Sequence, residues 1–321
     1  MNLAGRTSAL GSLLLESPCE IIQLQEVWSD DHYESSKRAI VRSLPAMSAT
    51  RADSTQNPYL GQSGLAIFTS DFLTDQSFEK FEINQAGIFD RIRGTLGVIK
   101  GIAYSKIHFR SDDTSSLHMM NLHTHPSSVP VRISQIVQLL ETFERMLPLT
   151  APVVITGDFN FEPDSVEYEL LKNVSLFTDS YAGNHGVYSS TTCTYCASNP
   201  QHWGGGSRVI DFVWLRSSNA QKIKSVSSMI NLQEFQGLVP SDHFGLRSNI
   251  ELATEAPTVV SPEIHHERLV RAGRSVAKAI EILDGEDSDT YSGVVAKLRS
   301  YRVRLLTQDL NDPMVQQLMI P

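Results

Sequence analysis

Thr156-Gly157-Asp158-Phe159-Asn160 directly follows the apolar run Val153–Ile155, and this order decides how we expect the chain to fold. The run predicts a strand buried on both faces, and the glycine after it allows a sharp turn. Asp158 and Asn160 then stand at the carboxyl end of the strand, where open α/β sheets bind ligands. Carboxylate and amide oxygens suit Mg²⁺, but a turn in which both side chains bond their own backbone explains the same residues equally well.

The size and charge of the chain limit its architecture and its ligands. A chain of 321 residues with 41% hydrophobic content predicts one main domain of about 200–250 residues with an appendage. The net charge of −9 argues against strong general affinity for nucleic acid. No apolar run is long enough to span a membrane, and Ala9–Leu15 lacks the flanks and cleavage pattern of a signal peptide. We therefore expect a cytoplasmic or peripheral membrane protein.

The three cysteines predict neither a disulfide framework nor a zinc site. Cys193 and Cys196 are separated by two residues, but the second pair that a structural zinc site needs is missing from the sequence. We therefore expect them to be ordinary thiols.

Two further strands end in polar residues that could bind a metal or take part in catalysis. The alternating segment Glu20–Glu26 ends in a carboxylate that is either a metal ligand or a solvated surface group. The strand Leu117–His125 ends in His123 and His125, which stand two residues apart and so share a face. We expect His125 to act in chemistry and His123 to be structural.

A buried aspartate and a distant histidine form the next predicted pair. Asp211 lies inside the apolar strand Val209–Leu215, where a lone carboxylate is costly to bury without a partner. His243, in Ser241-Asp242-His243, supplies one, because a carboxylate on one ring nitrogen fixes the tautomer and raises the basicity of the other. A helix cap or a turn explains the Ser-Asp-His sequence alone as well as a site does.

These residues together resemble the ordered motifs of the endonuclease/exonuclease/phosphatase superfamily over residues 6–252. The resemblance implies a DNase I-like fold, a two-sheet α/β sandwich with its site at one edge of the sheets. The matching motifs are Leu24-Gln25-Glu26, Thr124-His125, Gly157-Asp158-Phe159-Asn160, Ile210-Asp211-Phe212-Val213 and Ser241-Asp242-His243.

The resemblance implies a metal site and a cofactor. Glu26 resembles the main Mg²⁺ ligand of the family, and Asp242 resembles a second carboxylate of the metal site. We accordingly expect a Mg²⁺-dependent enzyme in which Mn²⁺ is a substitute.

The catalytic roles also come from the resemblance. Asp158 and Asn160 are similar to the residues that orient the water and the phosphate, and Asp211 with His243 is similar to the pair that activates water. His125 is similar to the histidine that stabilises the phosphoryl oxygens.

Two segments narrow the expected substrate. Lys100, within Ile99–Ile107, and Tyr195, after Thr194, resemble substrate-binding elements of neutral sphingomyelinases. This implies a sphingomyelin phosphodiesterase that releases phosphocholine and ceramide at a membrane surface. The alternatives are a nuclease or phosphoinositide phosphatase of the same superfamily, with nucleic acid disfavoured by the acidic chain, and a catalytically impaired variant that acts as a binding protein.

The two ends of the chain complete the predicted organisation. In the family a first strand carries an asparagine of the metal site, and Asn2 is too near the start to fill that place, so we expect an N-terminally incomplete catalytic domain over residues 1–252. Residues 253–262 predict a linker. Two apolar stripes in residues 263–321 predict a helical hairpin that packs on the domain or binds a protein partner or a membrane surface.

Overall fold

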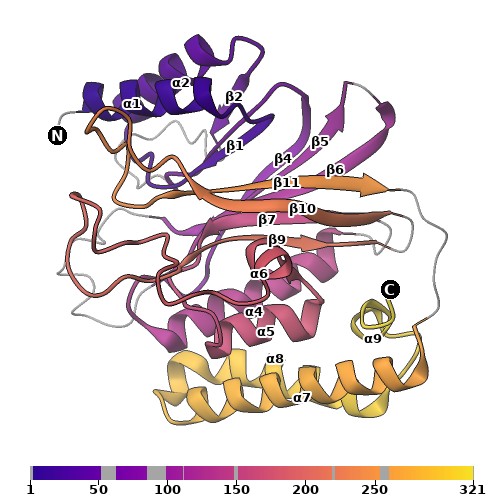
Figure 1. Ribbon diagram of the computed structural model, residues 1–321. Helices are drawn as coiled ribbons and strands as arrows, with labels where there is room; N and C mark the ends of the chain where they lie inside the picture. The colour runs from indigo at the N-terminus through magenta and orange to yellow at the C-terminus, as the bar shows by residue number, and fades with distance from the viewer. Residues whose placement is uncertain are drawn as a thin grey trace.

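Three β-sheets form two facing layers, with helices on both outer sides (Figure 1). The computed structural model describes residues 3–51, 63–84, 99–110, 112–147, 151–218, 221–253 and 260–320. Within these ranges a six-stranded sheet has the order β4-β5-β6-β7-β9-β8, and the other layer holds a three-stranded sheet, β1-β3-β2, and the hairpin β10-β11. The strands are β1 (Ile21–Leu24), β2 (Ser48–Arg51), β3 (Ala66–Thr69), β4 (Phe72–Lys80), β5 (Gly101–Phe109), β6 (Asp112–His123), β7 (Val153–Asp158), β8 (Thr178–Asp179), β9 (Asp211–Arg216), β10 (Lys222–Asn231) and β11 (Gly245–Ala253). The helices are α1 (Leu3–Glu16), α2 (Asp30–Ser43), α4 (Val129–Met146), α5 (Val166–Ser175), α6 (Ser180–His185), α7 (Pro262–Asp284), α8 (Ser288–Thr307) and α9 (Pro313–Gln317).

The two layers meet through an apolar interface. Met119 of β6, Val154 of β7 and Leu215 of β9 come from the large sheet, and Ile67 of β3 and Ile223 of β10 come from the two small ones. Successive strand residues alternate between faces, so each strand gives its other set of side chains to the opposite side. The expected two-sheet α/β sandwich is confirmed.

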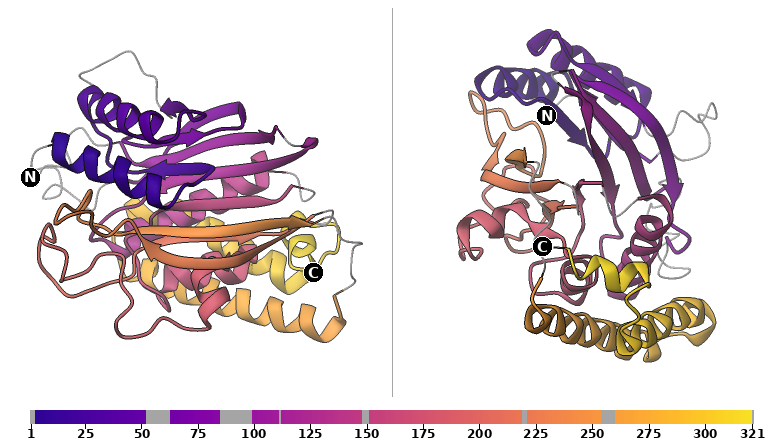
Figure 2. Two further views of the ribbon diagram at one scale, coloured as in Figure 1. Left: turned by 45° about the horizontal axis from the view of Figure 1, so that its top comes forward. Right: turned by 90° about the vertical axis from the view of Figure 1, so that its right-hand side faces the viewer.

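The other face of the large sheet carries the main core. Phe159, Phe212 and Trp214 are fully buried there, and the aromatic rings pack against one another under α4 and α5. On the far side of the small sheets, α1 and α2 bury Leu14 and Ile40 against β1 and β3. Helices thus cover the outer face of the large sheet and the outer face of β1 and β3 (Figure 2).

The C-terminal hairpin belongs to the same core. The predicted stripe from Leu269 to Leu283 on α7 is buried, and α8 contributes Leu298 and Tyr301 to the cluster that also holds α4 and α5. The predicted helical hairpin is therefore confirmed, and it packs on the domain. Its binding to a partner stays a prediction. None of the helices in the described ranges combines the length and the apolar character that a bilayer crossing requires.

Two local expectations from the sequence are wrong. Gly157 makes no sharp turn, because it lies inside β7, where a side chain would collide with the backbone carbonyl oxygen of Leu122 on β6. Cys193 and Cys196 are joined by a disulfide, whereas Cys19 is a free thiol. Asn2 and residues 254–259 of the expected linker lie outside the described residues.

A buried histidine in β6 makes the stability of the fold depend on pH. His118 is 7% exposed, and Nδ1 of its ring lies 2.8 Å from the hydroxyl oxygen of Tyr104. Burial, helped by the charges of Lys106 and Arg216, lowers the pKa of His118 to about 4.

We expect the free energy of unfolding to fall as the pH falls from about 6.5 to about 4, because only the unfolded chain then protonates this ring. One group contributes at most about 1.4 kcal/mol per pH unit. Denaturant unfolding at a series of pH values checks this, with His118→Gln expected to flatten the slope and the exposed His266→Gln as the control. An equal slope in all three proteins would contradict it.

Candidate active site

The register of three neighbouring strands places three polar residues in one row. His123 at the end of β6 lies opposite Asp158 at the end of β7, and Asp158 lies opposite Asp211 at the start of β9. Residues directly opposite each other in a sheet project on the same face. The register therefore brings together side chains that lie far apart in the sequence.

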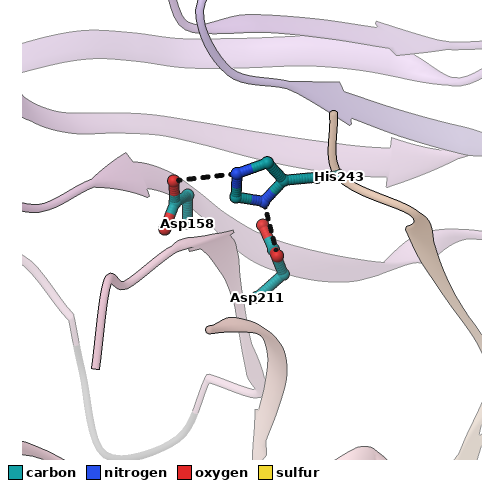
Figure 3. Close-up of side chains that lie close together, drawn as sticks. All are labelled: Asp158, Asp211 and His243. Atoms are coloured by element: carbon teal, nitrogen blue, oxygen red, sulfur yellow. Dashed lines mark hydrogen bonds and ion pairs between the residues drawn. The ribbon is translucent and has the colours of Figure 1, made fainter. Parts of the chain in front are cut away.

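His243 joins this row from the loop before β11 (Figure 3). Its Nδ1 lies 2.8 Å from Oδ2 of Asp211, and its Nε2 lies 4.0 Å from Oδ2 of Asp158. The predicted contact between Asp211 and His243 is thus present. Burial lowers the pKa of His243, but the carboxylates of Asp211, Asp158 and Asp242 outweigh burial and raise it to about 10. The surrounding carboxylates therefore favour the protonated form of the imidazole.

Asp158 is the buried carboxylate at the centre of the row. Its Oδ1 accepts the backbone N–H of Asn160 at 2.9 Å, and the side-chain amide of Asn160 donates to the carbonyl oxygen of Thr124 at 3.2 Å. Burial and the neighbouring Asp211 raise the pKa of Asp158 to about 7. The turn and the site, which the sequence left as alternatives, are both present.

The structure places His123, rather than His125, against Asp158. Nε2 of His123 lies 3.5 Å from Oδ2 of Asp158 and 2.7 Å from Nζ of Lys100. The ring of His125 is buried, and its Nδ1 accepts the backbone N–H groups of the two serines at positions 127 and 128. The expectation that His125 acts in chemistry and that His123 is structural stays a prediction, and the contacts with Asp158 and Lys100 make His123 a second candidate.

Lys100 is a buried charge rather than a solvent-facing one. Its ammonium group donates to the carbonyl oxygen of Thr124 at 2.7 Å, in addition to its contact with His123. Burial lowers the pKa of Lys100 to about 8, although the carboxylates of Asp158 and Glu26 oppose this shift. The group lies within the site, where it balances part of the carboxylate charge.

The disulfide-closed segment positions the Asp211–His243 pair. Oγ1 of Thr194 accepts the backbone N–H of Asp211 at 3.2 Å, and its carbonyl oxygen accepts the N–H of Phe244 at 2.7 Å. The buried ring of Tyr195 lies 5.0 Å from the ring of His243. Sequence reasoning missed Thr194 because one threonine in a loop gives no signal before its partners are known.

Glu26 and Asp242 lie at the edge of the cluster. Glu26 has a left-handed backbone (φ 61°), its side chain is 57% exposed, and its Oε1 lies 4.0 Å from Nε2 of His123. Asp242 accepts a hydrogen bond from the hydroxyl of Ser241 at 3.4 Å. The charge of Asp242 raises the pKa of His243, and the charge of Glu26 raises the pKa of Lys100. The structure therefore brings the two predicted metal ligands to the site.

The donor set of the cluster fits a hard divalent cation. Among the described residues, Asp158, Asp211 and His243 each offer a ligand atom within 4.8 Å of the others. Burial, and then the neighbouring carboxylate of Asp211, raise the pKa of Asp158, and a bound cation would offset both effects. The carboxylate oxygens of Asp158 and Asp211 suit Mg²⁺ and Mn²⁺, whereas a ring nitrogen of His243 is a donor only when the imidazole is neutral.

Comparison with known proteins identifies the family. The profile of the endonuclease/exonuclease/phosphatase family matches residues 1–243, and the chain belongs to this family. Among curated proteins, the inositol phosphosphingolipids phospholipase C of Schizosaccharomyces pombe is 26% identical over 182 residues. That match covers 55% of this chain and 41% of the relative, so the chain spans well under half the length of the relative it matches.

Solved structures share the fold at low sequence identity. D. rerio TDP2, solved with a single-strand DNA product, is 18% identical, with a TM-score of 0.60 over 78% of this chain and 93% of its own. A mutant of the beta toxin of Staphylococcus aureus with bound magnesium ions is 14% identical, with a TM-score of 0.56 over 77% and 91%. Sphingomyelinase C of Streptomyces griseocarneus is 13% identical, with a TM-score of 0.54 over 78% and 92%.

The charge on Asp211 should control the protonation of His243. We expect Asp211→Asn to lower the pKa of His243 from about 10, because the variant loses the largest influence that raises it. Titration of the ring protons by NMR measures the pKa. Asp309→Asn, at an exposed position in the C-terminal region, is the control. If the His243 titration is the same in the Asp211 variant and the control, the pair does not form in solution.

Proposed function

We propose that this chain is a Mg²⁺-dependent phosphodiesterase that hydrolyses sphingomyelin and related phosphosphingolipids to ceramide and a phosphorylated headgroup. The observation that carries the proposal is the convergence of Asp158, Asp211, His243 and His123 at one edge of the sandwich in a chain of this family. This arrangement offers a proton-transfer pair beside a carboxylate cluster, which suits phosphoryl transfer.

The choice of a lipid substrate has two supports. The S. pombe relative is named for phospholipase C activity on inositol phosphosphingolipids, and one structure of the same fold is a sphingomyelinase C. The net charge of −9 disfavours the alternative of a nucleic-acid backbone, although D. rerio TDP2 shares the fold. The fold alone does not select among these substrates.

The reaction breaks one phosphorus–oxygen bond and forms another. The oxygen of water attacks phosphorus and loses a proton, and the bond from phosphorus to the ceramide oxygen breaks as that oxygen gains a proton. The products are ceramide and phosphocholine. Catalysis therefore requires proton transfer at two oxygens and stabilisation of the charge on the phosphoryl group.

The residues of the site divide these tasks. In its protonated form Nε2 of His243 donates a proton or a hydrogen bond, and in its neutral form it takes the proton of the attacking water while Asp211 holds Nδ1. The buried ammonium of Lys100 supplies positive charge toward the phosphoryl oxygens. Glu26 and Asp242, together with the carboxylate of Asp158, would hold Mg²⁺, and the bound cation would supply positive charge against the phosphate and would favour the neutral form of the imidazole.

Removal of the His243 ring should abolish hydrolysis and leave the fold intact. We expect His243→Ala to lower turnover of choline-labelled sphingomyelin by about 10²–10⁴-fold, the usual cost of losing a general acid or base. The matched control is His266→Ala on the exposed face of α7. With melting temperatures unchanged, more than half of the original turnover in the His243 variant would rule out its role.

The same assay separates the substrate classes. Sphingomyelin, an inositol phosphosphingolipid, a phosphoinositide and plasmid DNA are offered to the unmodified chain with Mg²⁺, with Mn²⁺ and with chelator. We expect metal-dependent release of the phosphorylated headgroup from the sphingolipids alone. Nicking of DNA would instead support a nuclease, and no turnover of any ester would support a binding protein.

Glu26→Gln should raise the Mg²⁺ requirement, because the amide keeps the size of the side chain and removes the charge that the cation needs. Titration of Mg²⁺ against turnover gives the half-saturating concentration, with the exposed Glu281→Gln as the control. An unchanged half-saturating concentration in the Glu26 variant would show that Glu26 is not a ligand.

A further inference from the structure

The disulfide between Cys193 and Cys196 begins a segment, residues 193–201, that we call the clamp. Thr194 lies inside the disulfide loop and is fully buried. Its hydroxyl and carbonyl oxygens accept the backbone N–H groups that fix the Asp211–His243 pair. A change in the bonding of the two sulfur atoms therefore acts on the backbone that positions this pair.

The rest of the clamp holds the loop that carries His243. The side-chain amide of Asn199 donates to the carbonyl oxygen of Ser241 at 2.9 Å. The side-chain amide of Gln201 donates to the carbonyl oxygen of Val239, also at 2.9 Å. The position of His243 thus depends on hydrogen bonds that start from the segment closed by the disulfide.

The two cysteines differ in exposure. Cys193 is half-buried, whereas Cys196 is 2% exposed. An incoming thiolate therefore reaches Sγ of Cys193, and Cys196 is the leaving group. The spacing Cys-x-x-Cys is also the one found in disulfides that exchange with thiols in oxidoreductases. The bond is thus open to reduction while the protein is folded.

The disulfide contributes little to the stability of the whole fold. Its cysteines are only three positions apart, and the entropy that a crosslink removes from the unfolded chain is smaller for a shorter loop. Tyr195 also exchanges two backbone hydrogen bonds with Arg208, and these hold the clamp to the segment before β9 without the disulfide. Reduction should therefore loosen the clamp locally and leave the sandwich folded.

We propose that the Cys193–Cys196 disulfide is a redox site that controls the Asp211–His243 pair, and that the chain is more active when the disulfide is formed. The inference rests on the proposed function, because it assigns a regulation to that same site. Reduction releases the backbone around Thr194 from its covalent ring, so the two oxygens that fix the pair lose their set positions. A displacement of about 1 Å at a reacting group costs up to ~10²-fold in rate.

The reductant is a dithiol of the thioredoxin class. One of its thiolates forms a bond with Sγ of Cys193, the bond between the two cysteines breaks, and Cys196 leaves as a thiolate that takes up a proton. The second thiol of the reductant loses its proton and attacks the reductant sulfur of the mixed disulfide, which releases Cys193 as a thiol. The protein gains two electrons and two protons, and the dithiol becomes a disulfide.

Hydrogen exchange tests the effect on the clamp without an activity assay. The oxidised chain and the chain reduced with dithiothreitol, both without denaturant, are compared by NMR. We expect reduction to speed the exchange of the Phe244 and Asp211 amides about tenfold, because both donate to Thr194. The amide of Ile155, in a strand that is paired on both sides, should be unchanged. Equal exchange of Phe244 and Asp211 in the two forms would overturn the proposal.

Turnover tests the consequence for the site. Reduction should lower the metal-dependent hydrolysis of choline-labelled sphingomyelin about tenfold, and reoxidation should restore it. The double variant Cys193→Ser, Cys196→Ser should have the low turnover and no response to dithiothreitol. Cys19→Ser, which removes the free thiol, should respond like the unmodified chain. Equal turnover of the oxidised and reduced forms of an active chain would contradict the regulation.

The two measurements separate this inference from the proposed function. If neither form hydrolyses any of the esters, the proposed function fails, and hydrogen exchange alone decides whether the disulfide fixes the pair. Alkylation followed by mass spectrometry shows whether dithiothreitol reduces the folded chain, and resistance to reduction would overturn the proposal. Loss of the folded state on reduction, measured by circular dichroism, would also overturn it, because the disulfide would then be a structural crosslink.

Discussion

The close approach of β6 and β7, where Gly157 lies against the carbonyl oxygen of Leu122, is the constraint on which the site depends. Only a residue without a side chain allows this close approach, and the register of the two strands places Asp158 opposite His123. A slip of one residue would move Asp158 to the opposite face, among the aromatic side chains of the main core. The register of the backbone therefore determines which side chains lie together in the site.

The charges of the site are balanced across this row rather than within isolated pairs. Asp158 lies between His243 on one side and His123 with Lys100 on the other. Each carboxylate raises the affinity of its neighbours for a proton, while burial raises the pKa of Asp158 and opposes the raised pKa of His243. Protons in such a cluster belong to the group as a whole, so a substitution at one member changes the protonation of the others.

Much of the fold follows from the sequence because the evidence for it is local and repeated. The hydrophobic pattern of a segment predicts its burial without knowledge of its neighbours. This holds for the apolar run before Gly157, for the strand around Asp211 and for the stripes of the C-terminal helices. The predicted contact of Asp211 with His243 succeeded for a physical reason, since a carboxylate in an apolar strand needs a partner.

The remaining details depend on contacts between distant segments. His123 and His125 are two residues apart, so the strand pattern predicts the same face for both. Only the register of β6 with β7 shows that His123 lies opposite Asp158. Lys100 begins a strand by its sequence, yet its burial depends on Thr124 and His123. The disulfide between Cys193 and Cys196 depends on the conformation of the loop that holds them. Their separation by two residues in the sequence does not predict this conformation.

The position of the C-terminal helices also determines how the molecule can be attached to a surface. The hairpin of α7 and α8 covers α4 and α5, and α9 with the C-terminus lies near the end of the sandwich toward which β11 runs (Figure 1). His243 lies where β11 begins, at the opposite end of that strand. A protein immobilised through its C-terminus on a bead or a sensor chip would therefore turn the mouth of its site toward the solution, open to vesicles.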